Sequence, residues 1–170
     1  RSHAPARASS GHERKASLMM QAAPSTIEQV LLEHALAQVL TRYATVCDTR
    51  NYALLPEVFT EDCVTNYGGH SRHGIAAVHE MISTHLDGCG PTQHLLGNLE
   101  VDATSDPANV RSKIHVRAVH KGLGERSPLR YDAIGFYEDE WAQLPQGWRI
   151  QKRSMTLLLE IGDRTVLQPA

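Results

Sequence analysis

The stretch "PTQHLLGNLEVD", residues 91–102, divides the chain into two parts of different character. Before it, apolar residues recur at helical spacing. From residue 93 onward the pattern favours strands, which turn-forming residues separate. Four such strands are predicted, at about 93–102, 110–120, 129–140 and 148–160. Helices followed by a run of neighbouring strands are typical of an α+β domain with a curved antiparallel sheet.

Two amphipathic helices are expected ahead of this sheet. The first spans "PSTIEQVLLEHALAQVLTRYATVCD", in which Ser25 and Glu28 have capping-box spacing. The second is "GIAAVHEMISTHL", with an apolar stripe at helical spacing. Between them, "NYALLPEVFTEDC" predicts short helical turns that end near Thr60, and "CVTNY" predicts a short strand that stops at Gly68 and Gly69.

Composition limits the class of protein. A chain of 170 residues with 41% hydrophobic content suits one domain, and a formal charge of -2 without a long basic run argues against a nucleic-acid partner. No apolar run approaches the ~20 residues of a membrane span. Three widely spaced cysteines favour a reducing compartment, so we expect a cytoplasmic protein. We predict a disordered tail at 1–23, the domain at 24–163 and a C-terminal tail at 164–170.

Several segments, in this order, resemble the SnoaL-like branch of the nuclear transport factor two-like superfamily, which includes scytalone dehydratase. They are "RYATVCDTRNYALLPEVFTEDCVTNY", "HGIAAVHEMI", "TQHLLGN" and "GFYEDEW" with "GWRIQKRSM". The resemblance implies a cone-shaped α+β barrel, in which a bent sheet wraps the N-terminal helices around a deep apolar pocket. Such pockets host dehydratases, cyclases, isomerases, epoxide hydrolases and noncatalytic binders, so the fold alone does not define the function.

The resemblance also implies the site. Asp48 would pair with His94, fix the tautomer of its imidazole and increase its basicity, and His94 would act as general acid and base. Tyr67 would hydrogen-bond to a developing enolate, and His115 would be a second pocket histidine. Tyr43 and Tyr131 are the predicted substrate-binding residues.

Reasoning from the residues alone leaves alternatives open. A carboxylate at a helix C-terminus is electrostatically unfavourable, so another interaction must favour Asp48 there. Strict alternation from Leu96 places His94 on the face of Asn98 and Glu100, which is a wet outer face unless a β-bulge breaks the count. His115 shares its face with Lys113 and Arg117, which are residues typical of solvent.

Other patterns argue against further chemistry. His70 with His73, and His79 with His85, lack the acidic or cysteine partners of a closed zinc site, and no nucleotide-binding or serine-hydrolase motif occurs. We therefore expect neither a metal nor a cofactor. Asp132 and Asp139 with Arg153 resemble the Asp-Arg-Asp arrangement of limonene epoxide hydrolase, but the spacing does not match well, so we expect an exposed salt bridge.

The favoured function is a cofactor-independent lyase or cyclase of the dehydratase type, acting on a small cyclic, polyketide-derived carbonyl compound of secondary metabolism. A noncatalytic protein that binds a hydrophobic small molecule is one alternative. An isomerase of the ketosteroid type is another. Because open sheets of this kind often cover their outer face with a second subunit, a homo-oligomer, dimer or trimer, is expected.

Overall fold

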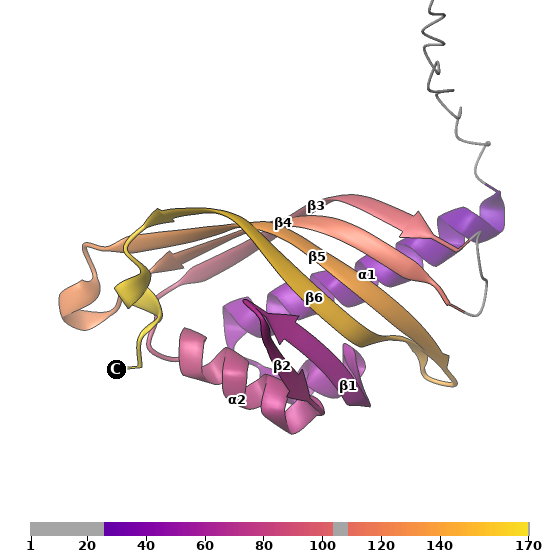
Figure 1. Cartoon of the computed structure of the whole chain (residues 1–170), viewed down its shortest axis with the longest axis horizontal. Coiled ribbons are helices and arrows are strands. Elements are labelled where there is room, and N and C mark those ends of the chain that lie inside the picture. Colours follow the sequence, from indigo (N-terminus) through magenta and orange to yellow (C-terminus); the bar gives the residue numbers. More distant parts are fainter. Residues whose placement is uncertain (1–25, 104–108, 170) are drawn as a thin grey trace, which may run out of the picture.

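A computed structural model describes residues 26–103 and 109–169. Its single six-stranded sheet has the order β2-β1-β6-β5-β4-β3. In Figure 1 the long strands β3–β6 arch over α1, while α2 and the β1–β2 hairpin lie on the other side of that helix. The strands are β1 (Phe59–Tyr67), β2 (His70–His73), β3 (Thr92–Asp102), β4 (Arg111–Lys121), β5 (Arg130–Leu144) and β6 (Gly147–Gly162). The predicted α+β class, with helices wrapped by a curved sheet, is confirmed.

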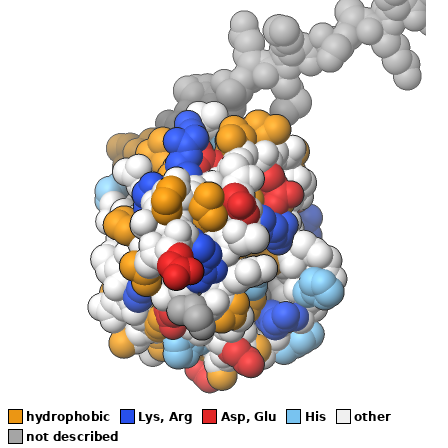
Figure 2. All heavy atoms as spheres, turned by 90° about the vertical axis from the view of Figure 1, so that its left-hand side faces the viewer, with side chains coloured by type: hydrophobic (Ala, Val, Ile, Leu, Met, Phe, Trp, Pro, Cys, Tyr) orange, Lys and Arg blue, Asp and Glu red, His pale blue; other side chains and the backbone are white. Residues whose placement is uncertain are grey.

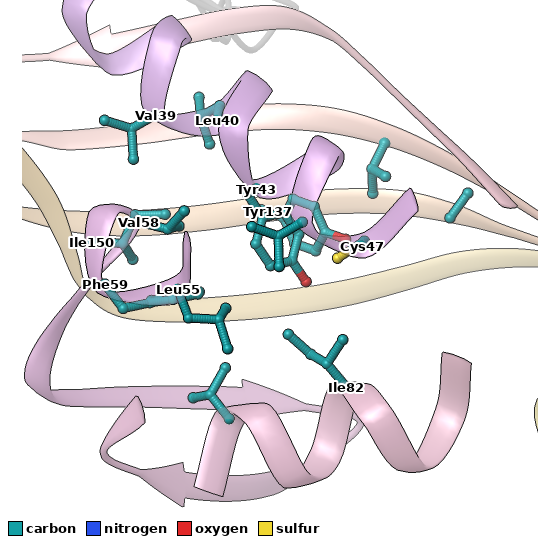
Figure 3. Packing of buried hydrophobic residues seen from close by; sticks show 14 of the residues in the cluster. Val39, Leu40, Tyr43, Cys47, Leu55, Val58, Phe59, Ile82, Tyr137 and Ile150 are labelled. Carbon is teal, nitrogen blue, oxygen red and sulfur yellow. The ribbon is translucent and has the colours of Figure 1, made fainter. Parts of the chain in front are cut away.

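The first helix, α1, covers Ile27–Thr49 and begins one residue later than the predicted capping box indicated. Thr26 is the N-cap, and it forms a capping box with Gln29 instead of the predicted pair of Ser25 and Glu28. One face of α1 is buried in the core, as Figure 3 shows for its inner turns. The helix ends at Arg50, whose left-handed φ of 59° turns the chain toward a short 3-10 helix, Tyr52–Glu57.

The hairpin of β1 and β2 differs from the prediction. Strand β1 begins at Phe59 rather than Cys63, and a second strand, β2, follows Gly68 and Gly69 where none was predicted. Gly68 and Gly69 join the two strands with φ of 62° and 85°, which glycine adopts without strain. Strand β1 also pairs in parallel with β6, so the sheet departs from the expected antiparallel pattern at this one pairing.

A bulge in β3 decides which side chains face the helices. The pairing of β3 with β4 shifts between Gly97 and Glu100, and Asn98 has a φ of 55°. Before the bulge, Leu96 is half-buried while Leu95 is 65% exposed; after it, Leu99 is half-buried. The alternation is therefore broken as a bulge would break it, and the outward assignment of His94 from simple counting is wrong.

The second helix, α2 (Ile75–Leu86), matches its prediction and buries Val78, Ile82 and Leu86. Residues 164–170 were predicted as a tail, yet Arg164–Leu167 form a 3-10 helix, η3, whose Val166 is fully buried. The predicted tail at 1–23 lies outside the described residues. Neither α1 nor α2, the longest helices in the described ranges, has the length and apolarity of a membrane span.

Candidate active site

A cavity of about 410 Å³ opens between α2 and the concave face of the sheet. This volume lies within the range of small-molecule pockets. Apolar side chains form much of its wall, and polar groups project into it from α1, α2, η3 and the strands β1 to β5. The polar lining residues include Tyr43, Tyr67, His94, His120, Tyr131 and Tyr137.

The polar lining comes from several elements. Tyr43 projects from α1, Tyr67 from β1, His94 from β3 and His120 from β4, and β5 contributes Tyr131 and Tyr137. The apolar wall includes Ile82 of α2, which Figure 3 shows across from Tyr43 and Tyr137. The cavity is therefore an apolar hollow with a limited set of hydrogen-bonding groups.

Asp48 and His94 form a close pair beside this cavity. Nδ1 of His94 lies 2.7 Å from Oδ1 of Asp48, and the backbone N–H of His94 donates to Oδ2 at 2.9 Å. The His94 side chain is only 6% exposed. Burial disfavours the charge of Asp48, but the hydrogen bonds from His94 and Thr92 outweigh it and lower the pKa of this carboxyl group below 3.8. Asp48 is therefore ionised, and its position at a helix C-terminus is explained by these donors.

The same geometry defines the tautomer of His94. An ionised carboxylate only accepts hydrogen bonds, so Nδ1 of His94 carries the proton. Nε2 is then left with its lone pair, and it has no hydrogen-bond partner among the described residues. Because His94 lines the cavity, Nε2 is the nitrogen available to a bound molecule. The arrangement suits a general base whose protonated form a carboxylate stabilises.

Arg50 holds the surroundings of this pair in place. Its guanidinium donates to the backbone carbonyls of Cys47, Leu86 and Gly90, which belong to α1, α2 and the approach to β3. It also donates to Oγ1 of Thr92 at 2.8 Å, and Thr92 in turn donates to Asp48 at 3.0 Å. Arg50 therefore orients the Thr92 hydroxyl so that its proton is directed at Asp48.

Three tyrosines lie together in the cavity. The hydroxyls of Tyr43 and Tyr67 are 2.9 Å apart, and the ring of Tyr137 lies edge-on to both. Burial raises the pKa of Tyr67, with Arg153 opposing the shift, and burial raises the pKa of Tyr43 well above 10.0. Both phenols therefore stay protonated, and the pair can donate a hydrogen bond to a ligand.

The predicted exposed salt bridge of Arg153 is wrong. Arg153 and Asp139 are fully buried and share two hydrogen bonds of 2.7 Å, and the guanidinium lies over the rings of Tyr43 and Tyr137. Asp132 instead pairs with the exposed Arg117 and Arg130. The buried Nη1 of Arg153 has no hydrogen-bond partner among the described residues. Cation–π contacts with the surrounding aromatic rings compensate in part for this missing hydrogen bond.

The second histidine of the cavity is His120 rather than His115. In β4 the residues Ile114, Val116, Ala118 and His120 point inward, whereas His115 is exposed and packs against Phe136 on the outer face. The rings of His120 and His94 have centroids 5.7 Å apart. The apolar residues at even positions of β4 were the signal that could have identified His120.

His120 is held in its neutral form. Its Nδ1 donates to the carbonyl of Tyr131 at 3.1 Å, which leaves Nε2 as an acceptor. Burial, with the nearby His94 adding to it, lowers the pKa of His120 to about 4. The predicted residue Tyr131 also lines the cavity, and its hydroxyl donates to Glu160 at 2.6 Å. The structure thus brings together five of the six predicted residues, all except His115.

Metal-binding patterns are absent from the part of the chain that the structure describes: no three His, Cys, Asp or Glu side chains converge there. His70 and His85 line the cavity, whereas His79 packs on Tyr52. The three cysteines are free and buried.

Comparisons with known proteins agree with this architecture. An uncharacterised protein of Mycobacterium tuberculosis is 28% identical over 123 residues, which cover 70% of this chain and 80% of that protein. A scytalone dehydratase candidate from Novosphingobium aromaticivorans superposes with a TM-score of 0.69 at 19% identity, over 78% of this chain and 87% of its own.

A hexachlorocyclohexane dehydrochlorinase, LinA-type3 from Novosphingobium barchaimii, superposes with a TM-score of 0.70 at 13% identity, over 82% of this chain and 94% of its own. These structural similarities concern the fold. The sequence model of the SnoaL-like domain matches residues 28–154, which is most of the chain. With the sheet, the helices and the cavity in the expected arrangement, the chain belongs to the SnoaL-like domain family.

Proposed function

We propose that this protein is a cofactor-independent lyase of the dehydratase type that acts on a small cyclic carbonyl compound, with a polyketide-derived substrate as the expected class. The observation that carries the proposal is the 2.7 Å contact between Asp48 and Nδ1 of His94 at the wall of an apolar cavity. The contact leaves Nε2 of His94 to handle a proton within that cavity.

In the proposed reaction, Nε2 of His94 takes a proton from the carbon α to the carbonyl group, and Asp48 stabilises the imidazolium that forms. The hydroxyls of Tyr43 and Tyr67 donate a hydrogen bond to the carbonyl oxygen as it gains enolate charge. The enolate then re-forms the carbonyl group, a double bond forms between the α and β carbons, and the C–O bond at the β carbon breaks. The leaving hydroxyl takes the proton from His94 and departs as water.

Two features of the site favour this chemistry. Each step needs only proton transfer and hydrogen bonding, which the described side chains supply. The environments of the two histidines also differ: His94 contacts a carboxylate, while His120 is kept neutral by burial. His120 then serves as a hydrogen-bond acceptor for the substrate.

The test uses 2-tetralone, a bicyclic ketone with acidic α-protons, as a probe of proton abstraction. Exchange of these protons with deuterated water is followed by NMR for the wild type and for His94→Gln, with His115→Gln as the matched control on the outer face. General base catalysis contributes roughly 10²–10⁴-fold, so His94→Gln is expected to lose exchange by about a hundredfold or more. Equal exchange by the wild type and His94→Gln would refute the role of His94.

A ketosteroid-type isomerase predicts a different pattern. Its base is a carboxylate, so Asp48→Asn would abolish exchange while His94→Gln would retain it. The direct hydrogen bonds from His94 to both oxygens of Asp48 argue against this alternative, because they occupy the carboxylate. A noncatalytic binder predicts no enzyme-dependent exchange in any variant.

A further inference from the structure

The mouth of the cavity gathers two arginines and two histidines from separate elements. His70 and Arg72 of β2, His85 of α2 and Arg164 of η3 all line the cavity. His70, His85 and Arg164 are exposed, so they lie at its opening rather than in its depth. None of the described residues that line the cavity is aspartate or glutamate. On the face of the molecule shown in Figure 2, histidine and Lys or Arg side chains lie next to one another near the lower right edge.

The strand pairing explains why β2 contributes two of these groups. His70 pairs with Tyr67, and Arg72 pairs with Thr65. Cross-strand partners project from the same face of a sheet. Tyr67 lines the cavity and Thr65 is fully buried, so this is the concave face. His70 and Arg72 are therefore directed toward the cavity by the register of the hairpin.

The two arginines differ in their partners. Arg164 donates to Glu160 at 2.8 Å, and Glu160 also accepts from Tyr131, so its charge is largely compensated. The hydrogen bond of Arg72 runs from Nη1 to the carbonyl of Ser71 at 3.2 Å. No carboxylate among the described residues forms an ion pair with Arg72. Its planar guanidinium, with five N–H donors, is suited to a carboxylate.

We infer that the cavity binds aromatic or alicyclic carboxylates, with the ring system in the apolar interior and the carboxylate at Arg72. This inference names the substrate class for the proposed reaction and so rests on the proposed function. Binding of the anion at the mouth orients the ring relative to His94 and the tyrosine pair. A remote ionic contact of this kind positions the reacting carbon without taking part in the proton transfer.

The experiment compares naphthalene-1-carboxylate with naphthalene-1-carboxamide, a neutral probe of nearly the same size and shape. Dissociation constants are measured by titration calorimetry at about pH 7. The wild type is expected to bind the carboxylate about tenfold more tightly than the carboxamide. Arg72→Gln is expected to reduce this preference to about twofold or less without changing the affinity for the carboxamide. Arg111→Gln, a change of an exposed arginine outside the cavity, is expected to keep it.

Equal affinity for the two probes, absence of binding of either, or an equal loss of both affinities in Arg72→Gln would overturn the inference. Raising the salt concentration gives a second measurement on the wild type, because it is expected to weaken binding of the carboxylate alone. The same titrations with His94→Gln separate this inference from the proposed function. If the wild type and His94→Gln both prefer the carboxylate while the wild type does not exchange the 2-tetralone protons, the catalytic role of His94 is refuted and the anion site at Arg72 is supported.

Discussion

Replacing His120 by glutamine should make the fold less sensitive to acid. The folded pKa of His120 is about 4, below the ordinary 6.5, because the side chain is buried beside His94 and near Arg50, with only Asp48 and the carbonyl of Tyr131 favouring the charge. Between these two values the unfolded chain binds a proton that the folded chain does not. Lowering the pH through this window therefore destabilises the fold.

The size of the effect follows from the same shift. Between about pH 7 and pH 4.5, His120 alone should lower the free energy of unfolding by about 2 kcal/mol. Urea denaturation at the two pH values measures this loss, which should be about 2 kcal/mol smaller in His120→Gln than in the wild type. His115→Gln, on the exposed face of the same strand, should behave like the wild type.

An equal pH dependence in the wild type and His120→Gln would refute the reasoning. A second measurement does not depend on the variant: NMR titration of the wild type should show the His120 ring still neutral at about pH 5.5. A ring that titrates near 6.5 would show that burial does not act on it as the structure implies.

Three further predictions test other parts of the structure. Arg50→Gln should lower the free energy of unfolding by about 2 kcal/mol, because Thr92 and the ends of both helices lose their common hydrogen-bond donor. It should also slow the exchange of the 2-tetralone α-protons by about tenfold, and unchanged exchange would contradict the positioning role of Arg50. Gly135→Ala should destabilise the fold by more than about 2 kcal/mol in denaturation, because its Cβ would lie 2.0 Å from the carbonyl oxygen of Thr156, whereas Gly97→Ala, with open space, should not. Leu95 and Leu159 are exposed on the outer face of the sheet and should lie in a homodimer interface. Analytical sedimentation should show that the wild type is a dimer and that the double variant Leu95→Lys, Leu159→Lys is a monomer. A monomeric wild type would refute this prediction.

Much of the fold could be predicted from local patterns. The long helix, α2 and the four C-terminal strands follow from apolar periodicity and turn residues, because burial of one face determines that periodicity. Strand β2 could not be found in this way: its residues, His70–His73, are polar, and pairing with β1 rather than an apolar pattern makes it a strand. The bulge at Asn98 likewise depends on the curvature of the whole sheet.

The candidate site was predictable where a motif, or the alternation of inward and outward side chains along a strand, pointed to it. The pairing of Asp48 with His94 came from a resemblance, and the distances now give it a physical basis. His120 lies on the same face of β4 as the buried apolar residues, whereas His115 lies on the opposite face. The buried pair of Arg153 and Asp139 joins neighbouring strands and gains its burial from Tyr43 of α1, so no local pattern marks it.

The most direct test of the central claim is the protonation state of the two ring nitrogens of His94. Two-bond proton–nitrogen NMR spectra of histidine-labelled protein, assigned with His94→Gln and recorded where the ring is neutral, distinguish the tautomers. The account predicts a protonated Nδ1 and an unprotonated Nε2, and it predicts that Asp48→Asn changes this distribution. A proton on Nε2, or a rapidly averaged mixture in the wild type, would contradict the claim that Asp48 prepares His94 to accept a proton in the cavity.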